Sequence, residues 1–177
     1  MPRIKKRMAL SLLAVIVLSP MIGLAILSAL AQRPAHLGIA AGRLAPCPDS
    51  PNCVSTQATD REHHIEPIPF DGPPESIIPR LEAAIASVPR MRIVTQQDGY
   101  LHAEATSLIF RFVDDVEFFV DRESRLIHFR SASRAGHSDL GVNRGRMERI
   151  RSEFLRLRSG VAYPQTTDEG GSRAVPR

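Results

Sequence analysis

Apolar and polar residues alternate through much of the chain between residues 91 and 131, and this pattern constrains the fold more than any other feature. Successive side chains of a strand point to opposite faces of a sheet, so alternation predicts strands with one apolar and one polar face. The predicted strands are Met91–Gln96, Tyr100–Phe112 with a bend near Ser107, Val116–Asp121 and Leu126–Ser131, with turns at Asp98-Gly99, Asp114-Asp115 and Arg122–Arg125. About four strands joined by short turns predict an antiparallel sheet.

The two faces of this predicted sheet differ in character. The apolar face holds Leu101, Ala103, Ala105, Phe110, Phe112, Val116, Phe118, Val120, Ile127 and Phe129. The opposite face holds His102, Glu104, Thr106, Arg111, Glu117, Asp121, His128 and Arg130. Opposite charges on neighbouring strands form cross-strand pairs worth ~0.2–1 kcal/mol each, and a solvated face has the same composition. The ionic face is therefore interpreted either as a solvated surface or as the wall of a polar cleft.

Two amphipathic helices are predicted, one on each side of the strands in the sequence. Residues 75–88 carry apolar side chains at helical spacing and end before Pro89. Residues 142–158 place Met147, Ile150, Phe154 and Leu157 on one face, and Gly160 is a suitable stop. A meander of strands flanked by helices predicts an α+β fold in which the helices pack on one face of the sheet.

The N-terminal segment predicts export. A basic start, with Arg3, Lys5, Lys6 and Arg7, precedes an uncharged apolar run of 24 residues (8–31). Such a run is either a membrane helix across a bilayer of ~30 Å or a signal peptide cleaved at the A-x-A-like site that ends at Ala31. The basic cluster stays inside in both cases. We expect a single-pass protein of the cell inner membrane with a periplasmic domain, and release to the periplasm after cleavage at Ala31 is the alternative.

The charge beyond the N-terminal segment excludes a generic nucleic-acid binder. The chain after Ala31 has 19 arginines and 19 acidic residues, so the exported part is formally neutral. A nucleic-acid binder needs a net positive surface that releases counterions from phosphates.

The cysteines and the composition predict how the chain is organised. Cys47 and Cys53 are the only cysteines, and in an oxidising compartment so close a pair predicts a disulfide worth ~2 kcal/mol. The predicted parts are a signal anchor or signal peptide (1–31), a linker (32–46), an α+β domain (47–160) and a disordered tail (161–177).

Polar residues concentrate in the last two strands and in the glycine-containing loop before the final helix. The candidate ligand-binding residues are Arg111, Asp114, Asp115, Glu117, Arg130, Ser131, Ser133, Arg134, His137, Asp139, Asn143 and Arg144. Arginine forks bind a carboxylate or phosphate through paired N–H donors, which predicts a small anionic ligand. We assign no catalytic residue, cofactor or metal, because the acidic residues match no EF-hand spacing and no G-x-S-x-G elbow is present.

Other interpretations of the same loop remain open. A hydrolase would use Ser131 or Ser133 with His137 and Asp139, although catalytic triads are assembled from distant segments and closeness in sequence does not indicate one. Asp139 or Asn143 is more simply the N-cap of the final helix. A structural domain would bury its ionic face against a partner in a membrane complex. The residues favour a binding role over an enzymatic one.

Three motifs resemble a known family. They are residues 47–55 (CPDSPNCVS), residues 110–117 (FRFVDDVE) and residues 130–144 (RSASRAGHSDLGVNR). This combination is similar to the domain-of-unknown-function 1499 family over about residues 46–157. The resemblance implies an exported or membrane-anchored bacterial protein and supplies no established activity. We therefore expect an uncharacterised extracytoplasmic domain that acts as a non-enzymatic binding or envelope-associated module, with the membrane, a small anionic ligand or an envelope protein as partners.

Overall fold

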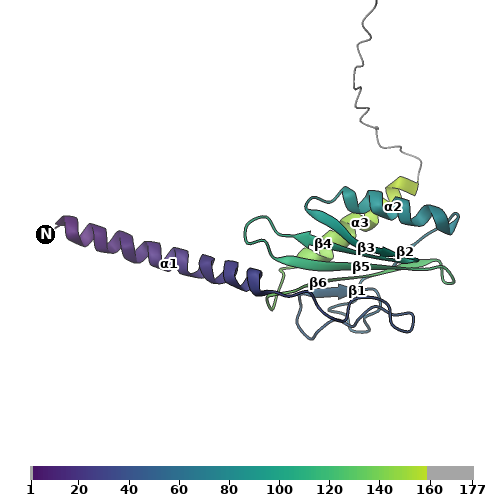
Figure 1. Ribbon diagram of the computed structural model, residues 1–177, viewed down its shortest axis with the longest axis horizontal. Helices are drawn as coiled ribbons and strands as arrows, with labels where there is room; N and C mark the ends of the chain where they lie inside the picture. The colour runs from purple at the N-terminus through teal and green to yellow at the C-terminus, as the bar shows by residue number, and fades with distance from the viewer. Residues whose placement is uncertain (1, 159–177) are drawn as a thin grey trace, which may run out of the picture.

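The computed structural model describes residues 2–158, and Figure 1 shows a long helix leading into a domain of one sheet and two helices. The first helix is α1 (Pro2–Leu30). The strands are β1 (Cys53–Ser55), β2 (Ile68–Pro69), β3 (Met91–Gln97), β4 (Tyr100–Thr106), β5 (Val113–Asp121) and β6 (Leu126–Ser133). The 3₁₀ turn η1 (Pro74–Ser76) precedes α2 (Ile77–Ala86), and α3 (Val142–Arg158) follows the last strand. The predicted α+β class is confirmed.

The sheet has six strands, so the prediction of about four was wrong in number. The strand order is β1-β6-β5-β4-β3, and β2 also pairs with β6. All of these pairs are antiparallel, as predicted. β1 and β2 contain only three and two residues. Alternation is not recognisable over so few residues, and both strands depend on pairing with the distant β6.

The connection between β4 and β5 lies earlier in the chain than predicted. β4 ends at Thr106, and the chain turns over residues 107–112, where Ser107 N donates to Phe112 O at 2.8 Å. Arg111 has a positive φ of 59° in this loop. The predicted strand to Phe112 and the predicted turn at Asp114-Asp115 are therefore wrong. Two adjacent aspartates resemble a turn, but here both lie within β5 because buried arginines compensate their charge.

The hydrophobic core fills the space between one face of the sheet and α2 with α3 (Figure 1). The sheet contributes the predicted apolar residues except Phe110 and Phe112, which belong to the 107–112 loop and are partly exposed. α2 buries Ile77, Leu81, Ala84 and Ile85. α3 buries Met147, Ile150 and Phe154, the face predicted from helical spacing. The guanidinium of Arg80 stacks 3.7 Å from the centre of the Phe154 ring and joins the two helices.

The predicted disulfide between Cys47 and Cys53 is present and closes the loop before β1. Within the part of the chain that the structure describes, no helix combines the length and the apolar character needed to cross a membrane. Gly160 and the predicted tail at 161–177 lie outside the described residues.

Candidate functional site

The ionic side of the sheet is covered by protein, which the sequence did not predict. This polar face consists of Tyr100, His102 and Glu104 of β4, Asp115 and Glu117 of β5, and Arg130 of β6. Residues 32–46, here the covering segment, reach it at two points. Arg33 Nη2 donates to Glu104 Oε1 at 2.6 Å, and Gly38 N donates to Glu117 Oε1 at 2.7 Å. Asp115, Glu117 and Arg130 are 1%, 0% and 3% exposed, so the interpretation as a solvated surface is wrong for them.

One group of the polar face forms around Glu117. Its carboxylate accepts from the Tyr100 hydroxyl at 2.9 Å and from Arg130 Nη1 at 3.4 Å. Burial and the neighbouring Glu117 carboxylate raise the pKa of Tyr100, so the phenol keeps its proton and acts as a donor. Arg130 Nε is buried and has no hydrogen-bond partner among the described residues. The Glu117 group is thus closed except for one donor of Arg130.

A second group forms around Asp115, which Arg134 binds with a bidentate fork. Arg134 Nε and Nη2 donate to the two carboxylate oxygens at 2.9 and 2.7 Å, and His102 Nε2 lies 2.8 Å from Oδ1. Arg134 also donates to Glu104 at 2.6 Å. Burial opposes ionisation, but the hydrogen bonds from Arg134 and His102 hold the pKa of Asp115 at about 2, and those from Arg33 and Arg134 do the same for Glu104. Both acids are ionised and internally paired.

A third polar cluster lies on the opposite face of the sheet, under the start of α3. Asp114 points to this face because successive strand residues alternate. Arg146 binds Asp114 through Nη2, and through Nη1 it donates to Asn143 Oδ1 at 2.6 Å and Ser131 Oγ at 3.0 Å. Asn143 Nδ2 donates to Ser133 Oγ and to Asn52 O, both at 3.0 Å. This cluster fastens α3 to β5, β6 and the disulfide loop.

The remaining predicted site residues do not join these clusters. Arg111 and His137 are exposed in separate loops. Asp139, one of the two residues predicted to cap the final helix, lies before α3 and accepts from Gly141 N at 3.0 Å and from Asn143 N, the second residue of α3, at 2.7 Å. Arg144 Nη2 donates to the carbonyls of Glu62 and His64.

The structure does not assemble the Ser/His/Asp arrangement of a hydrolase. Ser131 and Ser133 both hydrogen-bond to Asn143, and Asp139 is occupied by backbone amides of the helix start. His137 makes no hydrogen bond to any of these side chains within the described residues.

The candidate ligand-binding set lacked Asn52, Tyr100, His102, Glu104 and Arg146, although His102 and Glu104 were predicted to lie on the ionic face. The sequence did contain a signal for Tyr100 and His102. Both alternate along β4 in step with Glu104 and therefore point to the same face of the sheet. Arg146 lies three residues after Asn143 and therefore on the same helix face. Asn52 had no signal, because it takes part through its backbone carbonyl.

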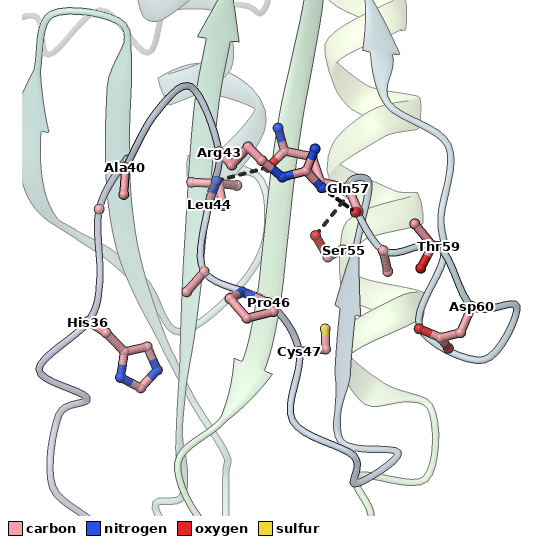
Figure 2. Close-up of a pocket in the computed structure, with 13 residues that line it drawn as sticks. His36, Ala40, Arg43, Leu44, Pro46, Cys47, Ser55, Gln57, Thr59 and Asp60 are labelled. Atoms are coloured by element: carbon pink, nitrogen blue, oxygen red, sulfur yellow. Dashed lines mark hydrogen bonds between the residues drawn. The ribbon is translucent and has the colours of Figure 1, made fainter.

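A pocket of about 750 Å³ lies beside the polar face, between residues 36–47 and residues 55–60 (Figure 2). Two of its lining residues belong to the edge of the polar face. Gly38 donates to Glu117, and Ser55 is the register partner of Arg130 in the β1·β6 pair. The Cys47–Cys53 disulfide holds one wall. The covering segment therefore closes the ionic groups from solvent and at the same time forms an open hollow next to them.

The charged side chains of this pocket are Arg43, Asp60 and, when protonated, His36. Arg43 Nη2 donates to Gln57 O at 2.9 Å, and Leu44 N donates to Gln57 Oε1 at 2.8 Å, which joins the two walls (Figure 2). Asp60 accepts from His63 N at 2.9 Å and lies 2.8 Å from His63 Nδ1. Within the residues that the structure describes, no group of three or more His, Cys, Asp or Glu side chains is placed to hold a metal ion.

Comparison with known proteins gives a family and no activity. The profile of a family described as "Protein of unknown function (DUF1499)" matches residues 43–154. The match spans all six strands, α2 and most of α3, together with most of the pocket lining. No curated protein matches the chain.

Proposed function

The chain belongs to the DUF1499 family of proteins of unknown function, and from that premise we propose that its domain is a binding module whose ligand occupies the pocket between residues 36–47 and 55–60. The pocket itself carries the proposal. A hollow of about 750 Å³ is within the range that holds small-molecule ligands, ~300–1,000 Å³. A disulfide, a strand and an ordered loop wall it, so it exists before a ligand arrives.

The lining indicates an amphiphilic ligand with one anionic group. Ala40, Leu44, Ala45 and Pro46 supply apolar surface for the body of the ligand. Asp60 is already paired with His63, whereas the Arg43 guanidinium, among the described residues, donates to the neutral carbonyl of Gln57 and is paired with no carboxylate. The uncompensated charge of the pocket is therefore positive, and a guanidinium favours a carboxylate or phosphate.

The buried ionic groups support this pocket and do not form the binding surface. Their carboxylates are paired with arginines of the same face, so a ligand ion would have to displace an existing partner. Arg130 Nε is the exception, because it is buried without a hydrogen-bond partner among the described residues. Arg130 lies opposite Ser55 in the register of β1 and β6. A ligand anion that reached past Ser55 would satisfy it.

We also propose that the module is held at the inner membrane with its domain in the periplasm. The support is the basic start, the apolar run at 8–31 and the exposure of the described apolar side chains of α1. From residue 8 onward α1 carries no charged side chain, and such a segment favours a nonpolar environment. Cleavage after Ala31 would release the same domain into the periplasm.

Native mass spectrometry of the full chain, extracted from its own membrane in mild detergent, tests the ligand proposal. We expect an added mass on the wild type that is retained in Arg151→Gln and lost in Arg43→Gln. These variants are matched, because Arg151 also donates one hydrogen bond to a backbone carbonyl, that of Glu66, away from the pocket. A bare protein mass, or equal retention in both variants, would overturn the pocket as the binding site.

A further inference from the structure

The exposed large apolar side chains of the domain are not scattered. Among the described residues outside α1 they are Ile39, Leu108, Ile109, Leu140 and Val142. Leu108 and Ile109 belong to the loop 107–112 between β4 and β5, Leu140 belongs to the loop 134–141 that leads into α3, and Val142 is the first residue of α3. Leu108 and Ile109 are each 70% exposed, and Leu140 is 93% exposed. Single exposed apolar residues are ordinary, but three in two loops and a fourth at the adjoining helix start are typical of an interaction site.

The topology brings the two loops to one end of the sheet. β5 lies between β4 and β6, and the 107–112 loop enters β5 where β6 leaves the sheet. Asp114 and Ser133 are register partners there, and Arg134 N donates to Val113 O at 3.1 Å. The loops therefore start from adjacent positions of the same edge.

α1 reaches the domain at this same end. Three residues after α1 ends at Leu30, Arg33 binds Glu104, which is two residues from the end of β4. Figure 1 shows α1 leaving the domain beside the connection between β4 and β5. A membrane that surrounds α1 would thus lie next to both loops.

The loops hold their apolar side chains outward at a conformational cost. Arg111 and Leu140 have positive φ values of 59° and 55°, a region that L-residues other than Asn and Asp rarely adopt. Ser107 Oγ accepts from Phe112 N at 2.9 Å, and Asp139 accepts from the amides after Leu140, so each loop is shaped by its own hydrogen bonds. Leu140 is thus held almost completely exposed by a loop with a defined backbone conformation.

We propose that loops 107–112 and 134–141 insert Leu108, Ile109 and Leu140 into the surface of the lipid bilayer that holds α1. Arg111, exposed in the same loop as Leu108 and Ile109, would meet anionic headgroups while the leucines and isoleucine reach the acyl boundary. A lipid surface fits better than a protein partner because the apolar tips adjoin the apolar helix α1. The inference rests on the proposed membrane retention, and it defines the orientation of the domain relative to the bilayer.

The chain has no tryptophan, so a single introduced tryptophan reports its own environment. We would prepare full-length Leu140→Trp and Ile109→Trp, with Glu123→Trp in the β5–β6 turn at the other end of the sheet as control and Leu18→Trp as a probe of α1. Each would be reconstituted into phosphatidylcholine–phosphatidylglycerol vesicles that contain bromine-labelled lipid. We expect the Leu140 and Ile109 probes to be quenched at least threefold more than the Glu123 probe.

The probes separate this inference from the membrane proposal. If Leu18→Trp is quenched and the loop probes match Glu123→Trp, the loop inference is wrong and membrane retention stands. If only the loop probes are quenched, the loops bind lipid and retention by α1 is wrong. A blue-shifted loop probe that bromolipid does not quench would mean that protein covers the loops, as a second copy of the chain would, and would overturn the lipid assignment. Leu140 and Glu123 are exposed, so these substitutions leave the core intact.

Discussion

The adjacent residues Asp114 and Asp115 show how one strand supplies two unrelated polar clusters. Asp114 binds Arg146 under α3, and Asp115 binds Arg134 under the covering segment. Each carboxylate is taken from water and must be compensated where it lies. The contribution of each aspartate to the stability of the fold therefore depends on the arginine that pairs with it.

Asp115→Asn is expected to lower the free energy of unfolding by about 1.5–3 kcal/mol, because Arg134 loses its bidentate carboxylate partner and keeps only its hydrogen bond to Glu104. Asp98→Asn is the matched control, since Asp98 pairs with Arg122 at an exposed site where such pairs contribute ~0–1 kcal/mol. Urea denaturation measures both. Equal losses would contradict the burial argument.

Asp115 should also make the free energy of unfolding depend on pH. The pKa of Asp115 is about 2 in the folded chain and ~3.9 in an unfolded one. Its stabilising effect is complete above the unfolded value and is lost as pH falls toward 2. The stability difference between the wild type and Asp115→Asn should therefore shrink between pH 5 and 2. A constant difference over that interval would mean that Asp115 is not held in its ionised form.

His63 should make the free energy of unfolding depend on pH in a higher range. Burial opposes its charge, but hydrogen bonds to Ser50 O and Asp60 raise the pKa of the imidazole. Its contribution is complete below the unfolded pKa of ~6.5 and is lost as pH rises through the raised folded value. His63→Gln should cost about 1–2 kcal/mol at pH 5.5 and progressively less above pH 7 in urea denaturation. His137→Gln, at an exposed loop position, should change stability at neither pH.

Among the larger parts of the fold, the covering segment decides whether the polar face is accessible. It is not a regular helix or strand, and two contacts with the sheet, at Arg33 and Gly38, place it. Gly38 has a φ of 116°, which brings its amide to Glu117 and which a side chain would strain.

Glu117→Gln is expected to loosen this segment, because a neutral amide oxygen accepts the Gly38 hydrogen bond more weakly than a carboxylate. The Gly38 amide should exchange with deuterium about tenfold faster, equivalent to ~1.4 kcal/mol, in hydrogen-exchange mass spectrometry. The Val120 amide, bonded to Gly99 O, should not change. An unprotected Gly38 amide in the wild type would show that the segment is undocked in solution.

For the molecule as a whole, the central strand β5 is buried on both faces, with helices on one and the covering segment on the other. Phe118 is completely buried in the helix-side core, and Phe119 is partly exposed on the other face, stacked on His128. The hydrophobic core should therefore carry most of the stability.

Phe118→Ala should destabilise the protein by about 3–5 kcal/mol, a large part of the ~5–15 kcal/mol of a typical domain. Phe119→Ala removes the same side chain at the adjacent position and should cost clearly less, because its site is already partly hydrated. Thermal and urea unfolding measure the difference. A larger loss for Phe119 would mean that the covered side is the main core.

The sequence predicted what depends on local geometry. The period of two located β3 to β6, apart from the boundary between β4 and β5, and it assigned the apolar residues other than Phe110 and Phe112 to the helix side; helical spacing located α2 and α3. The cysteine pair, in a compartment inferred from the N-terminal segment, predicted the disulfide. The candidate residues Asp115, Glu117, Arg130 and Arg134 do gather, because three lie on paired strands of one face.

Only the tertiary structure decided whether those charges face water, protein or a ligand. Arg33 and Glu104 are 71 residues apart in the chain, and Gly38 and Glu117 are 79 apart. No local pattern specifies such contacts, because their energy appears only when the sheet is already formed. By itself the sequence determined an α+β chain with one ionic face. Long-range packing buried that face, formed the pocket beside it and brought the exposed apolar loops to the end of the domain that α1 joins.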